Sequence, residues 1–98
     1  MGIFGGSNIG KGLDDFHATP GAVLIDVRSE GEYAGGHIPG SINVPLDRIQ
    51  SIDVPKETPL FVYCASGARS SSACSWLNGN GYDAVNIGGL MGYHGELE

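Results

Sequence analysis

The sequence is poor in positive charge, since its 98 residues include five lysine and arginine residues against eleven aspartate and glutamate residues. The net charge of −6 argues against non-specific binding to nucleic acid or to an anionic membrane, because so few cations cannot neutralise many phosphates. The sequence also lacks any run of about 18 apolar residues that would span a membrane, and its start lacks the basic and hydrophobic regions of a secretory signal. We expect a cytoplasmic protein whose partners are small molecules or other proteins.

Cysteine is scarce as well, because Cys64 and Cys74 are the only two. Two cysteines at this spacing make neither a disulfide framework, nor a C-x-x-C redox pair, nor a zinc site. We therefore predict a protein of a reducing compartment that needs no metal and no cofactor. Cys74 lies on a predicted helix beside Ala73 and Leu77, and we expect it to be buried in the core.

The pattern of apolar segments and turn residues predicts one small α/β domain over residues 13–98, preceded by a glycine-rich, flexible arm over residues 1–12. Strands that alternate with helices indicate a mostly parallel central sheet with helices on both faces. The last two residues, Leu97 and Glu98, could derive from an expression tag. The expected helices cover residues 13–18, a turn capped by Ser29, residues 46–50 and 70–77, and a short C-terminal segment after Gly89; the expected strands cover residues 22–25, 41–44, 60–63 and 84–87.

The most informative segment is the junction at Cys64, which follows an apolar strand and precedes a loop and a helix. A thiol placed there meets several backbone N–H groups and the positive end of the helix dipole, so its pKa falls and the reactive thiolate is favoured. Four residues separate Cys64 from Arg69. The ring of amides that this C-x4-R spacing can form is small, and it suits a terminal sulfur better than a phosphate.

The loop after the cysteine has the composition of an anion cradle. Gly67 lets the chain turn with its N–H groups inward, Ser66 adds a hydroxyl donor, and Arg69 adds a charged one. The side chains of Ala65 and Ala68 are small, so we expect the mouth of the cradle to be open. The predicted site therefore consists of the nucleophile Cys64 and residues 65–69.

Five segments in a fixed order resemble a single-domain rhodanese, and the resemblance covers residues 13–95. They are residues 24–28, 32–33, 36–43, 62–64 and 88–89. Any one of them would be a weak signal, but together and in family order they are a strong one. The resemblance implies a rhodanese-like α/β fold with a central parallel sheet.

The resemblance also implies a sulfurtransferase, in which a loop cysteine takes a sulfane sulfur from a donor such as thiosulfate. The resulting persulfide passes the sulfur to a thiophilic acceptor such as cyanide or a thiol. Cys64 matches that cysteine. Many relatives carry an arginine where this chain has Ala65, so recognition of a free dianion is expected to be weak, and a persulfide-carrying protein or small persulfide is an open alternative as donor.

Four further residues are predicted to support the site. Asp26 ends a neighbouring strand at the same edge of the sheet as Cys64, and we expect its carboxylate to face Arg69. Arg28 and Glu32 are expected to form an ion pair. His37 stands in a Pro-Gly turn, where we expect it to hydrogen-bond the backbone and fix the loop.

Two other functions stay open at this point. Phosphatases and arsenate reductases on the same scaffold have a longer C-x5-R loop, which disfavours them here. A non-catalytic rhodanese-like module that binds a protein partner is the second alternative, and the presence of the cysteine argues against it.

Overall fold

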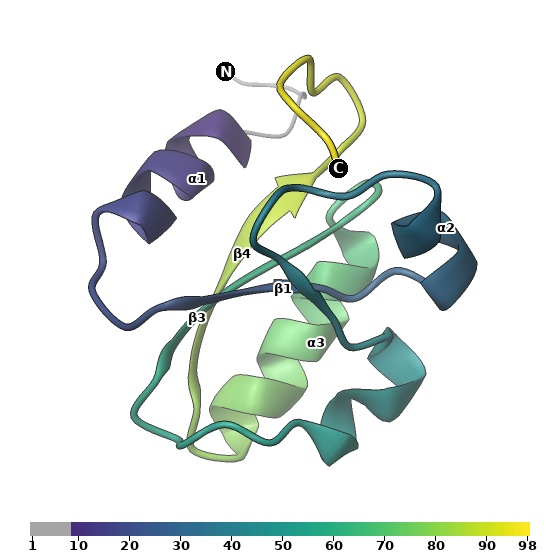
Figure 1. The fold of residues 1–98 in the computed structure, drawn as a ribbon. Coiled ribbons are helices and arrows are strands. Elements are labelled where there is room, and N and C mark those ends of the chain that lie inside the picture. Colours follow the sequence, from purple (N-terminus) through teal and green to yellow (C-terminus); the bar gives the residue numbers. More distant parts are fainter. Residues whose placement is uncertain (1–8) are drawn as a thin grey trace.

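The computed structural model describes residues 9–98, which form an all-parallel sheet of four strands. Across the sheet the strand order is β2-β1-β3-β4 (Figure 1), and the predicted α/β class is confirmed. The strands are β1 (Val23–Asp26), β2 (Ile42–Asn43), β3 (Pro59–Cys64) and β4 (Asp83–Gly89).

Helices cover both faces of this sheet. One face packs against α3 (Ala68–Gly79) and the 3-10 helix η1 (Leu46–Ser51), and the other packs against α1 (Ile9–His17). The short helix α2 (Glu30–Ala34) lies in the connection between β1 and β2 (Figure 1), and Ser29 caps it as predicted. Within residues 9–98 no helix is both long and apolar enough to cross a lipid bilayer.

Successive side chains of β3 point to opposite faces of the sheet, so they pack against different helices. Leu60, Val62 and Cys64 face the core beneath α3, whereas Phe61 and Tyr63 face the core beneath α1. In the register of the sheet, Asp26 of β1 lies opposite Tyr63. The catalytic candidate Cys64 therefore points to the α3 side.

Two predictions at the ends of the chain are wrong. The first helix begins at Ile9, not at residue 13, so residues 9–12 are helical and not part of a flexible arm; residues 1–8 lie outside the described residues. Ile9 is buried in the core beneath α1, and that contact holds this turn of helix. After Gly89 the chain continues in turns rather than in a helix, and Glu98 exchanges two backbone hydrogen bonds with His37.

The contact between α1 and β4 depends on a glycine. A Cβ atom added at Gly12 would lie 2.3 Å from the Cβ of Ile87, whereas a Cβ at Gly10 would meet nothing within 4 Å. The absence of a side chain at Gly12 thus sets how closely α1 approaches the sheet.

Gly12→Ala should lower the free energy of unfolding by about 1–3 kcal/mol, because overpacking at Ile87 outweighs the gain in helix propensity. Gly10→Ala on the same helix is the matched control and should raise it by up to about 1 kcal/mol. Urea denaturation of both variants checks this, and equal effects of the two substitutions would contradict the packing.

Candidate functional site around Cys64

The turn between β3 and α3 places the thiol beneath the start of a helix. Gly67 precedes α3 with a φ of +100°, a left-handed conformation that residues with a side chain rarely adopt. This reversal turns the backbone N–H of Gly67 back toward Cys64. The glycine predicted to shape the loop has that role in the structure.

Two backbone N–H donors and one hydroxyl group converge on the sulfur. The backbone N–H of Gly67 lies 3.0 Å from Cys64 Sγ, the backbone N–H of Ser70 lies 3.4 Å from it, and the Ser70 hydroxyl oxygen also lies at 3.4 Å. Ser70 lies in the first turn of α3, and Gly67 is the residue directly before the helix. At this end of a helix the dipole favours negative charge. The arrangement suits a sulfur anion.

The two thiols of the chain have opposite electrostatic environments. Burial is the largest single effect on Cys64 and raises its pKa, but hydrogen bonds from the Ser70 hydroxyl and from the backbone of Ser70, Gly67 and Ser66 together outweigh it, so the pKa is lowered. Burial alone raises the pKa of Cys74 to about 11. Cys74 is buried in the core, as predicted, and it is a poor nucleophile at neutral pH.

The sulfur lies under its loop and not at an open mouth. Cys64 is 0% exposed, so the prediction that the small Ala65 and Ala68 leave it accessible is wrong. The Ser66 hydroxyl accepts the N–H of Ala68 at 3.4 Å and does not point at the sulfur. A substrate therefore reaches the sulfur only if the groups that cover it move.

Arg69 is paired with Glu32, and not with Asp26 as predicted. Its two terminal nitrogens contact the two carboxylate oxygens of Glu32 at 2.7 and 3.0 Å. Hydrogen bonding from Arg69, and then from the backbone of Ser29, lowers the pKa of Glu32 to about 2. Arg69 also interacts electrostatically with Cys64, so it lies near the site. Glu32 balances most of its positive charge.

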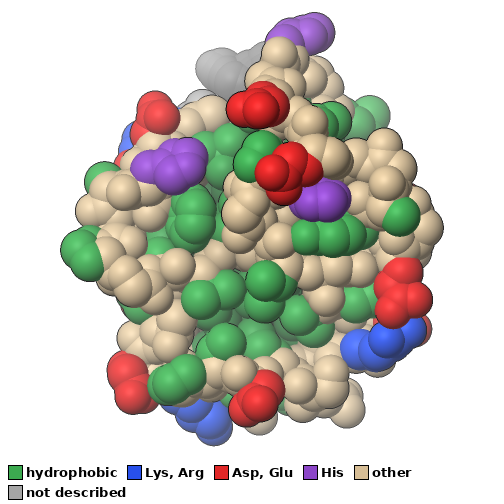
Figure 2. Space-filling model, viewed as in Figure 1, with side chains coloured by type: hydrophobic (Ala, Val, Ile, Leu, Met, Phe, Trp, Pro, Cys, Tyr) green, Lys and Arg blue, Asp and Glu red, His purple; other side chains and the backbone are tan. Residues whose placement is uncertain are grey.

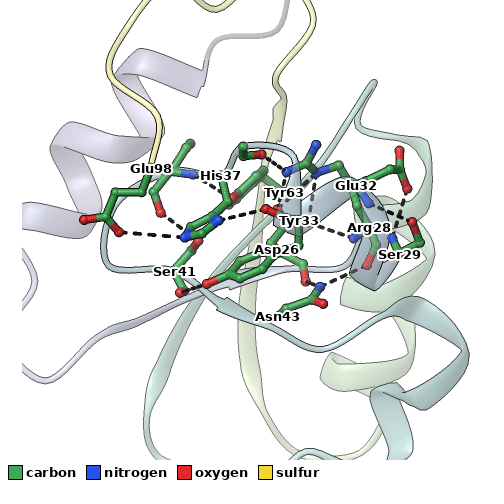
Figure 3. A network of polar contacts seen from close by, with 12 residues as sticks. Asp26, Arg28, Ser29, Glu32, Tyr33, His37, Ser41, Asn43, Tyr63 and Glu98 are labelled. Carbon is green, nitrogen blue, oxygen red and sulfur yellow. Dashed lines mark hydrogen bonds and ion pairs between the residues drawn. The ribbon is translucent and has the colours of Figure 1, made fainter.

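Asp26 forms a buried ion pair with Arg28 on the other side of the sheet (Figure 3), and the predicted pair of Arg28 with Glu32 is wrong. The Arg28 guanidinium donates to the two Asp26 oxygens at 2.7 to 3.1 Å and to the Gly36 carbonyl at 2.7 Å. Asp26 faces the same layer as Tyr63 and so points away from Cys64. This pair holds the β1 to β2 connection and does not touch the sulfur.

His37 fixes the loop through the backbone, as predicted. Its Nδ1 donates to the Tyr33 carbonyl at 2.9 Å, and the two rings stack with centroids 3.7 Å apart (Figure 3). The following turn closes by a hydrogen bond from the N–H of Ser41 to the carbonyl of Ile38, with Gly40 at a φ of +87°. These contacts are structural and lie on the Tyr63 side of the sheet.

Two residues at the site escaped the sequence-based prediction. Ser70, expected only as part of a helix-capping run, reaches the sulfur with both its N–H and its hydroxyl. Asn86 of β4 binds the Ser70 hydroxyl at 2.7 Å and the carbonyl of Gly67 at 3.1 Å. The position of Ser70 directly after Arg69 was a usable signal, whereas the sequence around Asn86 gave none.

A pocket of about 420 Å³ lies beside the loop. Val27, which follows Asp26 and belongs to the same core cluster as Cys64, forms part of its wall, and so does Arg69 at the start of α3. Its full lining is Val27, Ser29, Pro45, Leu46, Asp47 and Arg69.

Known proteins resemble this chain along most of its length. A family model described as rhodanese-like domain matches residues 11–96. A sulfurtransferase of Allochromatium vinosum is 37% identical over 79 residues, covering 76% of this chain and 74% of the relative. A putative sulfurtransferase of Bacillus subtilis, YtwF, is 37% identical over 80 residues, covering 76% of both. The crystal structure of a rhodanese-like domain protein from Staphylococcus aureus superposes with a TM-score of 0.77 and 31% identity, covering 92% of each chain.

Ser70→Ala should raise the pKa of Cys64 by roughly one unit, because a thiolate loses one of its donors. The pH dependence of alkylation of Cys64 by iodoacetamide, followed by intact mass spectrometry, measures this shift. Ser71→Ala, an exposed position one residue further along α3, is the control and should leave the profile unchanged. Identical profiles for Ser70→Ala and the wild type would show that the hydroxyl does not act on the sulfur.

Proposed function

This chain belongs to the rhodanese-like domain family, and we propose that it is a sulfurtransferase that carries a sulfane sulfur on Cys64. In the first half-reaction the thiolate attacks the sulfane sulfur of a donor such as thiosulfate; the new S–S bond forms at Sγ, and the donor's S–S bond breaks with its electron pair leaving on sulfite. In the second half-reaction an acceptor such as cyanide or a thiol attacks the outer sulfur, and the thiolate is released.

The observation that carries the proposal is the set of donors around Sγ. The N–H groups of Gly67 and Ser70 and the Ser70 hydroxyl stabilise the thiolate before attack. The same thiolate is the leaving group of the second half-reaction, so donors that hold it also lower the barrier to sulfur release. Within residues 9–98 the groups that bind the sulfur are these backbone and hydroxyl groups and not a histidine base.

The covered sulfur adds a requirement to this mechanism. Because Cys64 is 0% exposed, donor and acceptor reach it only after the loop over residues 65–68 moves. The pocket beside Arg69 and Val27 gives a bound substrate a place next to this loop. Chemistry and loop opening are therefore separate steps, and either can limit the rate.

The charges around the site favour a persulfide donor over free thiosulfate. Arg69, the one cation of the loop, is neutralised by Glu32, and Asp47 lies on the pocket wall. Acidic side chains outnumber basic ones on the face shown in Figure 2. A dianion gains little attraction here, so a small persulfide or a persulfide carried by another protein is the donor class that we propose.

A non-catalytic module that binds a protein partner is the second candidate. The observation that favours it is the burial of Cys64, since a thiol that never becomes accessible would serve only as a core residue. Sulfur loading distinguishes the two functions.

Incubation with thiosulfate, or with glutathione persulfide, should add one sulfur atom to the wild-type protein in intact mass spectrometry. Cys64→Ser should gain none, whereas Cys74→Ser should load like the wild type, because the Cys74 thiol is buried and its pKa is high. Failure of every donor to load a folded wild-type protein would favour the binding module. Loading that persists in Cys64→Ser would exclude Cys64 as the carrier.

Glu32→Gln should improve the use of thiosulfate, because it frees the charge of Arg69 while glutamine can still serve in the α2 capping box. We expect KM for thiosulfate to fall about two- to fivefold, the equivalent of roughly 0.5–1 kcal/mol for an exposed ion pair. Steady-state assays with thiosulfate and with an uncharged organic trisulfide measure the contrast, and KM for the uncharged donor should not change. An unchanged or higher KM for thiosulfate would contradict the proposed role of this ion pair.

A further inference from the structure

The side chain of Asn86 connects β4 to the start of α3. Its Oδ1 accepts the backbone N–H of Gly88 at 2.9 Å, and its Nδ2 donates to the carbonyl of Gly67 at 3.1 Å. A backbone N–H only donates and a carbonyl only accepts, so these contacts fix which end of the amide is the oxygen. The Ser70 hydroxyl lies 2.7 Å from that Oδ1 and must therefore donate to it.

The Ser70 hydroxyl has one proton and three acceptors within reach. Asn86 Oδ1 lies at 2.7 Å, whereas Cys64 Sγ and the carbonyl of Gly88 both lie at 3.4 Å. The shortest contact has the usual length of an O–H···O hydrogen bond, so the proton lies on the Asn86 side. Ser70 then presents a lone pair to the sulfur, and that lone pair accepts the proton of a neutral Cys64 thiol.

We propose that Asn86 is a positioning residue that controls Cys64 through Ser70. While the sulfur is neutral, the Ser70 hydroxyl donates its hydrogen bond to the side-chain carbonyl of Asn86. When the thiolate forms, the hydroxyl keeps its proton and donates the hydrogen bond to the sulfur instead. A thiolate has no proton to donate and requires donors, so when Cys64 loses its proton to solvent the hydroxyl rotates from Oδ1 to Sγ. Asn86 therefore opposes ionisation of Cys64. When the Ser70 hydroxyl turns to the sulfur, Asn86 Oδ1 still accepts the hydrogen bond from the N–H of Gly88.

In sulfur transfer the same exchange would follow the charge on the sulfur, and this part rests on the proposed carrier function of Cys64. When Sγ becomes the inner sulfur of a persulfide it is neutral, and the Ser70 hydroxyl returns to Asn86. When the outer sulfur leaves with the acceptor, the thiolate forms again and the hydroxyl turns back. Asn86 supplies the hydroxyl with an acceptor in the states in which the sulfur needs no donor.

The charged groups on the elements around Cys64 stay in place when Asn86 is replaced. Among them, Arg69 acts on Cys64 and is paired with Glu32. Replacement of Asn86 by an uncharged residue thus changes the hydrogen bonding of the sulfur and not the surrounding charge. These charged groups are Asp26 of β1, Glu30 and Glu32 of α2, Asp47 and Arg48 of η1, Arg69 of α3 and Asp83 of β4.

A double-mutant cycle on the full chain tests the proposal, with the pH dependence of Cys64 alkylation by iodoacetamide as the readout. Asn86→Ala should lower the pKa of Cys64 by about half a unit to one unit, because the Ser70 hydroxyl is freed for the thiolate. In a Ser70→Ala background the same substitution should leave the pKa unchanged. Asn86→Asp, which is nearly isosteric, should raise the pKa, because a carboxylate is a stronger acceptor and adds negative charge.

Either of two results would overturn the role of Asn86. One is a pKa that rises in Asn86→Ala, and the other is an equal shift with and without the Ser70 hydroxyl. If Asn86→Ala does not fold, Asn86→Asp is compared with and without the Ser70 hydroxyl, and an equal rise in pKa in both backgrounds counts against the proposal. The cycle needs no sulfur donor, so it can succeed even if sulfur loading fails, and the two proposals can be refuted separately.

Discussion

The hydrogen bonds from the backbone N–H groups of Gly67 and Ser70 to the Cys64 sulfur are the interactions on which the site depends. They exist because Gly67, three residues after the cysteine that ends β3, takes a left-handed conformation directly before α3. Burial by itself would raise the pKa of this thiol, as it does for Cys74. The same buried position thus holds a reactive sulfur only because the backbone supplies donors.

The two ion pairs near the site differ in what they do. Asp26 and Arg28 are both buried, and removal of either would leave an unpaired charge in the core at a cost of about 3–5 kcal/mol. That pair fixes the connection that brings α2 to the site. Arg69 and Glu32 are more than a third exposed, so their pair contributes little to stability. Its effect is on the charge that a substrate meets.

The sequence was enough to predict the parallel sheet, the strand-loop-helix unit at Cys64 and the burial of Cys74, because these follow from local patterns. The partners of the charged residues were predicted wrongly, since they depend on the register that places Asp26 opposite Tyr63 and away from Cys64. Asn86 was missed because its contacts need the shift of register in β4 that brings Gly88 opposite Tyr63. The covered sulfur was also missed, because it depends on how the loop packs, and the loop lies so close to β4 that a Cβ atom added at Gly89 would lie 2.2 Å from the Ala65 carbonyl oxygen.

Titration of the thiolate by ultraviolet absorbance tests most directly whether the backbone holds Cys64 as an anion. The two thiols are well separated, because the pKa of Cys74 is raised to about 11 while that of Cys64 is lowered. We predict one transition below the value of about 8.5 for free cysteine, present in the wild type and in Cys74→Ser and absent from Cys64→Ser. A Cys64 transition at or above that value would contradict the account.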